Sequence, residues 1–190
     1  MRSLTKEEFF MLFDEMKIEI EDGAIFIHPT DTTYGIGCDA TNKHTVMKIR
    51  DIKSKHIGPF PVIAPSKKWI LDNCIIGENS LKWLGKLPGP YTLILRLKNK
   101  SCIAKNVNFG LDSLAVRIPD NWFSEAVTKI GKPILSTIAN KSGTNFMTCL
   151  ENLESEIEEE VSFILYEGEK TGRPSTLVDL TGDDAVITKR

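Results

Sequence analysis

The sequence predicts an α/β fold in which helices pack around one twisted sheet. Short apolar stretches alternate with longer amphipathic stretches along the whole chain, which is typical of strands and helices that follow one another. Polar, glycine-containing segments follow three of the predicted strands, at residues 29–37, 139–148 and 168–176. Because ligands of such sheets bind beyond the ends of the strands, these three segments form the candidate site.

Length and composition are those of an ordinary globular protein. The 190 residues favour one domain spanning 1–190, and no apolar run is long enough to cross a membrane. The first ten residues lack the apolar core of a signal peptide, so we expect a cytoplasmic location and no membrane partner. The four cysteines are far apart and do not pair with a histidine at zinc-ligand spacing. We therefore expect reduced thiols and no structural metal.

The net charge of −2 conceals an uneven distribution of charge. Residues 151–160 contain six glutamates and no basic residue. Without these six, the 26 acidic residues fall to 20, against 24 basic ones. The rest of the surface can therefore present a positive face to an anion.

The first quarter of the chain is predicted to contain two helices and a strand. Residues 5–22 form one helix, with Thr5 and Glu8 as a capping box, and Gly23 ends it. Residues 24–27 form a buried strand that Pro29 ends, and a polar loop follows as far as Gly37. Asn42 caps a second helix, which ends in a basic cluster of Lys48, Arg50, Lys53 and Lys55.

The rest of the chain is predicted to alternate strands with helices. Strands are expected over residues 60–64, 91–98, 113–118, 133–138, 162–166, 175–180 and 185–189. Helices are expected after Ser66, around residues 81–84, from the cap Asn121 to Ile130, and over the acidic segment 150–161. The clearest strand is 91–98, in which Tyr91, Leu93, Leu95 and Leu97 share one face and Thr92, Ile94, Arg96 and Lys98 the other.

The polar segments and one arginine inside an apolar run indicate anion chemistry. Residues 30–33 place three hydroxyls and a carboxylate on successive positions, although an ordinary turn has the same composition and both interpretations stay open. Arg117 lies inside an apolar strand, where it is costly unless it pairs with an anion. The anion can be a ligand or a structural partner, and an exposed strand face is a further alternative. No pattern of a nucleophile with its base accompanies these groups. Cations and hydroxyls without a nucleophile suit phosphoryl or nucleotidyl transfer, in which positioning and charge neutralisation dominate.

Six stretches of the sequence together form a recognisable set: HPTDTTYGIGCDATN (28–42), IRDIKSK (49–55), LPGPYTLIL (87–95), SLAVRIPD (113–120), PILSTIANKSG (133–143) and GRPSTLVDL (172–180). They resemble motifs of the YrdC-like family, the threonylcarbamoyl-AMP synthases. Each motif is weak alone, but the six occur in the family's order and approximate spacing, and the resemblance spans nearly the whole chain. The resemblance implies a YrdC-like α/β fold, a twisted mixed sheet with helices packed around it and an open concave ligand-binding face.

The resemblance also implies a reaction. Such enzymes are nucleotidyltransferases that join L-threonine, bicarbonate and ATP into L-threonylcarbamoyl-AMP and release pyrophosphate. Mg²⁺ is expected with ATP, because two anions must meet in the site. A tRNA threonylcarbamoyltransferase is the expected downstream partner, and tRNA or double-stranded RNA is a further expected ligand.

Site residues carry over from the family by motif. Thr32 would bind L-threonine and Arg117 would pair with its carboxylate. Lys53 and Lys55 would be the catalytic residues and would hold the ATP phosphates. The remaining contacts to the nucleotide would come from Ser113, Asn140, Thr148, Ser175 and Lys189.

Three positions on the ATP side depart from the family pattern. Lys55 and Lys189 stand where the family usually has arginine, which keeps the charge but loses the bidentate fork. Ile138 replaces the serine of the family's S-x-N. The chain also ends after the YrdC-like part, so a short single-domain form is expected. Two interpretations follow: an active synthase, or a divergent, catalytically weakened member that binds nucleotide or RNA. A non-enzymatic scaffold would leave the polar segments unexplained.

Overall fold

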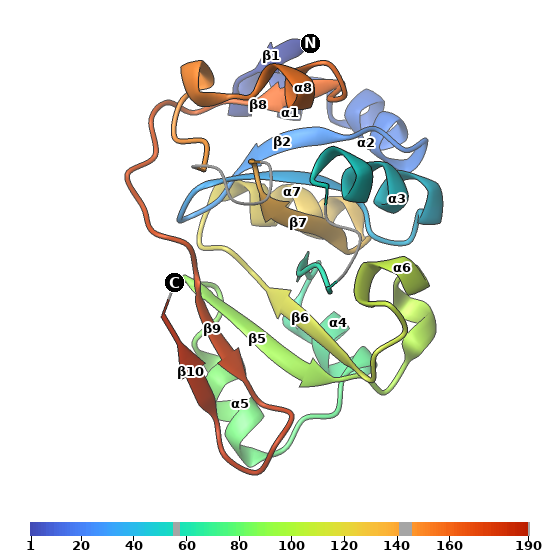
Figure 1. Cartoon of the computed structure of the whole chain (residues 1–190), viewed down its shortest axis with the longest axis vertical. Coiled ribbons are helices and arrows are strands. Elements are labelled where there is room, and N and C mark those ends of the chain that lie inside the picture. The colour runs from blue at the N-terminus through green and yellow to red at the C-terminus, as the bar shows by residue number, and fades with distance from the viewer. Residues whose placement is uncertain (55–57, 141–145, 190) are drawn as a thin grey trace.

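Figure 1 shows the computed structural model, which describes residues 1–54, 58–140 and 146–189. Within these ranges ten strands form one sheet in the order β1-β8-β2-β3-β7-β4-β6-β5-β9-β10. Parallel and antiparallel pairs both occur, which confirms the predicted mixed sheet. The strands are β1 (Arg2–Leu4), β2 (Phe26–Pro29), β3 (Tyr34–Asp39), β4 (Val62–Ile63), β5 (Tyr91–Arg96), β6 (Ser113–Arg117), β7 (Ile134–Ile138), β8 (Phe163–Leu165), β9 (Thr176–Asp179) and β10 (Val186–Thr188).

Helices surround this sheet, as predicted (Figure 1). They are α1 (Lys6–Met11), α2 (Phe13–Glu21), α3 (Lys43–Ile52), α4 (Lys67–Asn73), α5 (Glu78–Gly85), α6 (Lys105–Asn108), α7 (Trp122–Ile130) and α8 (Ser155–Glu158), with short 3-10 turns at Lys100–Cys102 and Leu150–Asn152. No helix among the described residues is both long and apolar enough to cross a membrane. The four cysteines are free thiols, as expected.

Two apolar cores lie on opposite faces of the sheet. Along β8, Phe163 and Leu165 belong to one core and Ile164 to the other, as the alternation of side chains in a strand requires. Helices α1, α2 and α7 supply the first core through Phe9, Met16, Phe123 and other residues. Helix α3 packs on the opposite face and contributes Val46 and Ile49 to the second core.

The shortest strand, β4, joins the two halves of the sheet. Its residue Val62 pairs antiparallel with Leu135 of β7 and parallel with Val116 of β6. Residues 60–64 were predicted to be a longer strand, but β4 contains only two of them. Before β4, Pro61 has no amide hydrogen to donate, and Phe60 N donates to Val107 O outside the sheet. The upper half of the sheet contains β1, β8, β2, β3 and β7, and the lower half contains β6, β5, β9 and β10. The two halves diverge on either side of β4 (Figure 1).

The prediction of a loop over residues 29–37 is wrong for its second part. Residues 34–39 form β3, a central strand that pairs antiparallel with β2 and β7. The glycines that suggested a loop are required by close contacts within the sheet. A Cβ at Gly35 would lie 2.8 Å from His28 Nε2, and one at Gly37 would lie 2.7 Å from Leu135 O of β7 and 3.1 Å from His28 Cδ2. The imidazole therefore fills the space beside Gly35, and the backbone of β7 with the imidazole fills the space beside Gly37. Strand β2 extends to Pro29.

Two helix predictions are also wrong in extent. Residues 5–22 form α1 and α2, separated at Leu12, whose backbone leaves the helical region (φ −102°, ψ 19°). The acidic segment 150–161 forms only a 3-10 turn and the one-turn helix α8. Six glutamates in ten residues repel one another, and Ile157 is the only residue of α8 that is buried. Strand β1 was not predicted, since its three residues show no strand pattern.

Asn42 and Asn121, which both precede helices, differ in what their side chains do. Asn42 Oδ1 accepts hydrogen bonds from His44 N at 3.1 Å and Thr45 N at 3.2 Å, as predicted for a cap. Asn121 makes no capping bond, which contradicts the prediction. Its buried amide nitrogen and oxygen have no hydrogen-bond partner in the described part of the chain.

We predict opposite results for alanine at these two positions. Asn42→Ala should lower the free energy of unfolding by about 1 kcal/mol, since it removes a helix cap. Asn121→Ala should cost less than about 0.5 kcal/mol, because it removes a buried amide that is not satisfied. Urea denaturation of both variants measures the difference. If both variants lost the same free energy of unfolding, the conclusion that Asn42 caps its helix and Asn121 does not would be contradicted.

Candidate functional site

A cavity of about 450 Å³ lies between the diverging halves of the sheet. This size is within the range of small-molecule sites. Strands β3, β5, β6, β7 and β9 contribute to the lining. The rest comes from the loops after β2 and β7, the end of α3, and the segments before β4 and β9. Five of the predicted site residues line it together: Thr32, Lys53, Arg117, Asn140 and Ser175. The predicted concave ligand-binding face is therefore present.

Alternate residues of three strands form the floor of the cavity. Thr92 and Ile94 come from β5, Ala115 and Arg117 from β6, and Leu177 from β9. The register places Ile94 opposite Ala115 and Thr92 opposite Leu177, so these side chains share one face. In β5, the strand that the sequence predicted most clearly, the cavity floor is formed by the face that carries Thr92 and Ile94. The leucines of the opposite face are buried in the core.

The loop between β2 and β3 turns its hydroxyls toward the cavity. Thr30 Oγ1 donates to Thr33 O at 2.7 Å and lies 2.9 Å from Thr32 Oγ1. A hydroxyl has one hydrogen, so Thr32 is the donor in the second contact. The lone pairs of Thr32 Oγ1 then remain available as acceptors for an N–H or O–H group of a ligand. Residues 30–33 thus form a turn, and the hydroxyls of this turn line the cavity.

Arg117 forms the structural ion pair that its sequence position allowed, and it also lines the cavity. Its Nη2 donates to Asp31 Oδ1 at 2.5 Å, and both side chains are about nine-tenths buried. Asp31 Oδ2 also accepts from Asp120 N at 3.0 Å. Arg117 is thus a cation that lines the cavity and is held in place by a carboxylate from the opposite half of the sheet. The sequence showed Asp31 but not this partnership.

Lys53 lies at the end of α3 and joins it to the end of β7. Its Nζ donates to Ile138 O at 2.6 Å and to Asn140 Oδ1 at 2.9 Å, and also to Asn140 O. Lys53 is buried, with 4% of its surface exposed. Its ammonium therefore gathers the carbonyl and amide groups that lead out of β7. Ile138 and Asn140 line the cavity beside it.

The segment that connects β8 to β9 closes one side of the cavity. Tyr34 Oη donates to Gly168 O at 2.6 Å and accepts from Glu167 N at 3.0 Å. Burial raises the pKa of Tyr34 to about 12, so the phenol stays protonated and can donate. Further along, Gly172 packs so closely on Thr32 that a Cβ there would lie 2.2 Å from Thr32 O. Ser175, at the end of this segment, shares a hydrogen bond of 2.7 Å with Thr92.

His28 is a buried, neutral imidazole behind the site. Its ring stacks on Phe123, with centroids 4.5 Å apart, and its Nδ1 lies 3.2 Å from Pro29 O. A carbonyl can only accept, so Nδ1 carries the proton. Nε2 has no hydrogen-bond partner among the described residues. Burial lowers the pKa of His28 to about 3, the bond to Pro29 opposes this, and the charge of Arg117 lowers it further.

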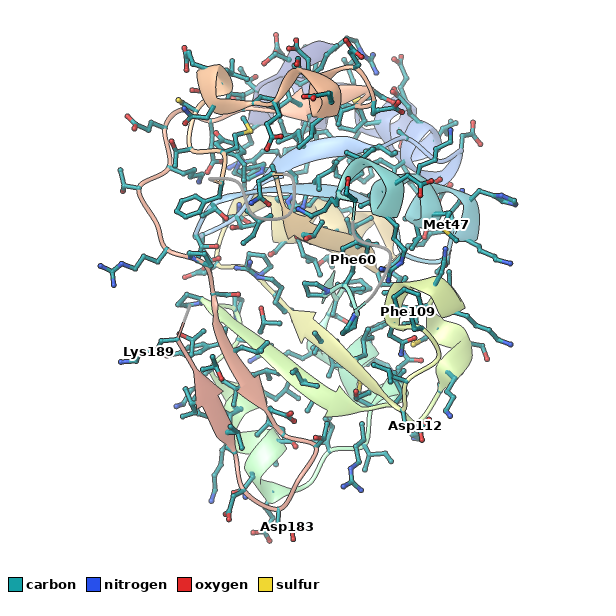
Figure 2. The ribbon with its side chains drawn as sticks, viewed as in Figure 1. Met47, Phe60, Phe109, Asp112, Asp183 and Lys189 are labelled. Carbon is teal, nitrogen blue, oxygen red and sulfur yellow. The ribbon has the colours of Figure 1, made fainter. Side chains whose placement is uncertain are left out.

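The other predicted site residues lie elsewhere. Ser113 is on the same face of β6 as Ala115, but it does not line the cavity. Thr148 Oγ1 donates to Asn152 Oδ1 at 2.7 Å and does not reach the cavity, while Lys189 is exposed just beyond β10 (Figure 2). Lys55 lies outside the described residues. Reasoning by motif did not include Tyr34, Ser136 or Thr137, which line the cavity.

The comparisons with known proteins agree with this geometry. The family model for Sua5, YciO and YrdC, described as telomere recombination, matches residues 19–190. The chain belongs to the Sua5/YciO/YrdC family. This family membership confirms the resemblance that the six motifs suggested.

Individual relatives cover most of the chain. A Methanocaldococcus jannaschii protein, whose name includes threonylcarbamoyl-AMP synthase, is 31% identical over 98% of this chain and 88% of its own length. The threonylcarbamoyl-AMP synthase of Vibrio parahaemolyticus is 29% identical over 88% of this chain and 93% of its own length. The structure of P. abyssi Sua5 complexed with L-threonine superimposes with a TM-score of 0.86 at 24% identity. It covers 98% of this chain, which spans 56% of the length of that Sua5 chain.

Gly172 should not tolerate a side chain. Gly172→Ala should lower the free energy of unfolding by about 1–3 kcal/mol, because its methyl group would overlap the backbone of Thr32. The matched control is Gly85→Ala, since no atom lies within 4 Å of the added Cβ there. Urea denaturation compares the two variants. A Gly172→Ala variant as stable as the control would show that this close contact does not hold the segment.

His28 should make folding stability depend on pH. Its folded pKa of about 3 is below the ordinary 6.5, so its contribution is complete above pH 6.5. Stability is then lost as the pH falls toward 3, at up to about 1.4 kcal/mol per pH unit. We expect His28→Phe to lose less stability than the parent between pH 8 and pH 4.5. At pH 8, the difference in the free energy of unfolding between parent and variant measures the change in packing alone. If the same difference were found at pH 4.5, the prediction would be contradicted.

Proposed function

We propose that this protein is an L-threonylcarbamoyladenylate synthase, an enzyme that makes threonylcarbamoyl-AMP and pyrophosphate from L-threonine, bicarbonate and ATP. The observation that carries the proposal is the convergence of Thr32, Arg117, Lys53, Asn140 and Ser175 on one cavity. These residues come from five separate places in the sequence and match the family's motifs. The names of the relatives, and the L-threonine in the P. abyssi Sua5 structure, support the same reaction.

Thr32 and Arg117 form the amino-acid end of the proposed site. Thr32 Oγ1 donates to Thr30, so it presents lone pairs that accept from the substrate's amine or hydroxyl. Arg117 faces the cavity and provides a cation for the substrate carboxylate. Asp31 orients this guanidinium, which reduces the entropy lost when the ligand is bound.

Lys53, Asn140 and Ser175 form the nucleotide end. Lys53 supplies positive charge near the triphosphate, with Lys55 as a second cation. We propose that Mg²⁺ enters bound to ATP and neutralises its phosphates. In the described lining, hydroxyls and amides are present and carboxylates are not, and no group of three metal-binding side chains occurs in the described residues.

The proposed chemistry needs no protein nucleophile. The threonine amine attacks carbon dioxide, derived from bicarbonate, and forms a carbamate. A carbamate oxygen then attacks the α-phosphorus of ATP, and the bond from that phosphorus to the bridging oxygen breaks as pyrophosphate leaves. The protein positions two anions and offsets their repulsion with Arg117 and Lys53. Within the cytoplasm, a tRNA threonylcarbamoyltransferase would then pass the threonylcarbamoyl group to tRNA.

A second candidate function rests on Ile138. This side chain lines the cavity where the family pattern has serine, so one hydroxyl donor is missing beside the proposed phosphate site. Loss of such a donor can slow a reaction by about 10²–10³. The alternative is a catalytically weakened family member that binds nucleotide or RNA.

Pyrophosphate release tests the proposed function directly. The purified protein, with ATP, Mg²⁺, bicarbonate and L-threonine, should release pyrophosphate only when threonine and bicarbonate are both present. Omitting each in turn provides the controls. Clear binding of ATP and threonine without threonine-dependent release would refute the synthase and favour the alternative.

Ile138→Ser separates the two candidates further. It should raise turnover about tenfold or more if the missing hydroxyl weakens catalysis, since a new donor would reach the developing charge. The matched control is Ile94→Ser, on the cavity floor but on β5. No gain from an inactive parent would indicate a different ligand.

A further inference from the structure

We propose that Arg50 is a positioning residue for the nucleotide end of the site, an inference that rests on the proposed function. Arg50 lies on α3, three residues before Lys53. It is 1% exposed, which makes it the largest fully buried side chain of the described chain. It does not line the cavity and therefore acts through the residues that it holds.

The guanidinium of Arg50 joins three parts of the chain. Its Nε donates to Asn106 O at 2.8 Å and its Nη2 to Val107 O at 3.0 Å, both in α6. Its Nη1 donates to Gly58 O at 3.0 Å, in the segment before β4. A planar fork of donors is suited to bind several carbonyl groups in fixed directions at once.

Two aromatic rings enclose the same guanidinium. Arg50 Cζ lies 4.3 Å from the ring centroid of Phe60 and 4.0 Å from that of Phe109. Figure 2 shows both phenylalanines below α3, on the side of the molecule that carries α6. Phe109 has a left-handed backbone (φ 57°), which is rare for a bulky residue and is strained. Its stacking on Arg50 compensates for this strain.

These contacts define one wall of the cavity. Gly58 and Phe60 belong to residues 58–61, directly before β4, in which the alternate residues Pro59 and Pro61 line the cavity. Pro61 O also accepts from Ser136 N at 3.0 Å, which links the wall to β7. Burial lowers the pKa of Arg50, but a guanidinium stays charged in proteins. Arg50 therefore sets the distance of this wall from Lys53.

The test is Arg50→Lys, with the dissociation constants of MgATP and of L-threonine measured by calorimetry. Lysine keeps the charge but has no planar fork, so the wall loses its fixed position. We expect the dissociation constant of MgATP to rise about tenfold or more. That of L-threonine should change less than about twofold, because Thr32 and Arg117 are held by other contacts.

Phe109→Gly provides a second variant that preserves folding. Glycine suits the left-handed backbone at this position, so the melting temperature should change little, while the ring over Arg50 is lost. MgATP binding should weaken about threefold or more. The matched control is Leu111→Ala, since Leu111 is 47% exposed and Phe109 is 48% exposed. It should leave both dissociation constants unchanged.

Three other outcomes would overturn the inference. Unchanged MgATP binding in folded Arg50→Lys and Phe109→Gly variants would exclude a positioning role. If the dissociation constants of both ligands rose by the same factor while the melting temperature fell, Arg50 would contribute only to the stability of the core. A parent protein that binds neither ligand would overturn the proposed function and the inference with it. The failure of the inference alone is thus distinguishable from the failure of both.

Discussion

The ion pair between Asp31 and Arg117 connects the two halves of the sheet where the ladder between them is shortest. Asp31 follows β2 in the upper half, Arg117 ends β6 in the lower half, and β4 provides only two residues of pairing between them. The two carboxylate oxygens of Asp31 hold both the guanidinium and the backbone at Asp120. Such a buried pair adds little net stability, but the loss of one partner is costly. The shape of the cavity depends on this contact as well as on the short pairing through β4, because the ion pair links the loop after β2 directly to the end of β6.

Helix α3 separates its basic residues into different environments. Lys48 is exposed, Arg50 is buried between two aromatic rings, and Lys53 faces the cavity. Successive residues of a helix are rotated by about 100°, so Lys48 points away from Arg50, whereas Arg50 and Lys53, three positions apart, lie on the same side of α3. A helix end can therefore contribute a cation to the site and also the residue that fixes the neighbouring wall.

Close packing on both sides explains why the strand behind the site contains two glycines. The imidazole of His28 lies against Gly35 and Gly37 on the neighbouring strand and stacks on Phe123 of α7. A Cβ at Gly37 would in addition lie 2.7 Å from Leu135 O of β7. Glycine is unfavourable within a strand unless another group approaches closely. Here the approaching groups are a side chain of β2 and a backbone carbonyl of β7, whereas the hydroxyls of residues 30–33 line the cavity.

The sequence by itself determined the fold class, most of the strands and helix caps, and five of the residues that meet in the cavity. Capping at Asn42 and the alternation of residues 91–96 are local patterns, and Thr32, Lys53, Arg117, Asn140 and Ser175 belong to recognisable motifs. Only the tertiary structure decided that residues 34–39 form a strand, that Asp31 holds Arg117, and that Ser113, Thr148 and Lys189 lie outside the cavity. The physical reason is that local periodicity is encoded within a few turns of chain. Partners across strands depend instead on the register between segments that are distant in the sequence.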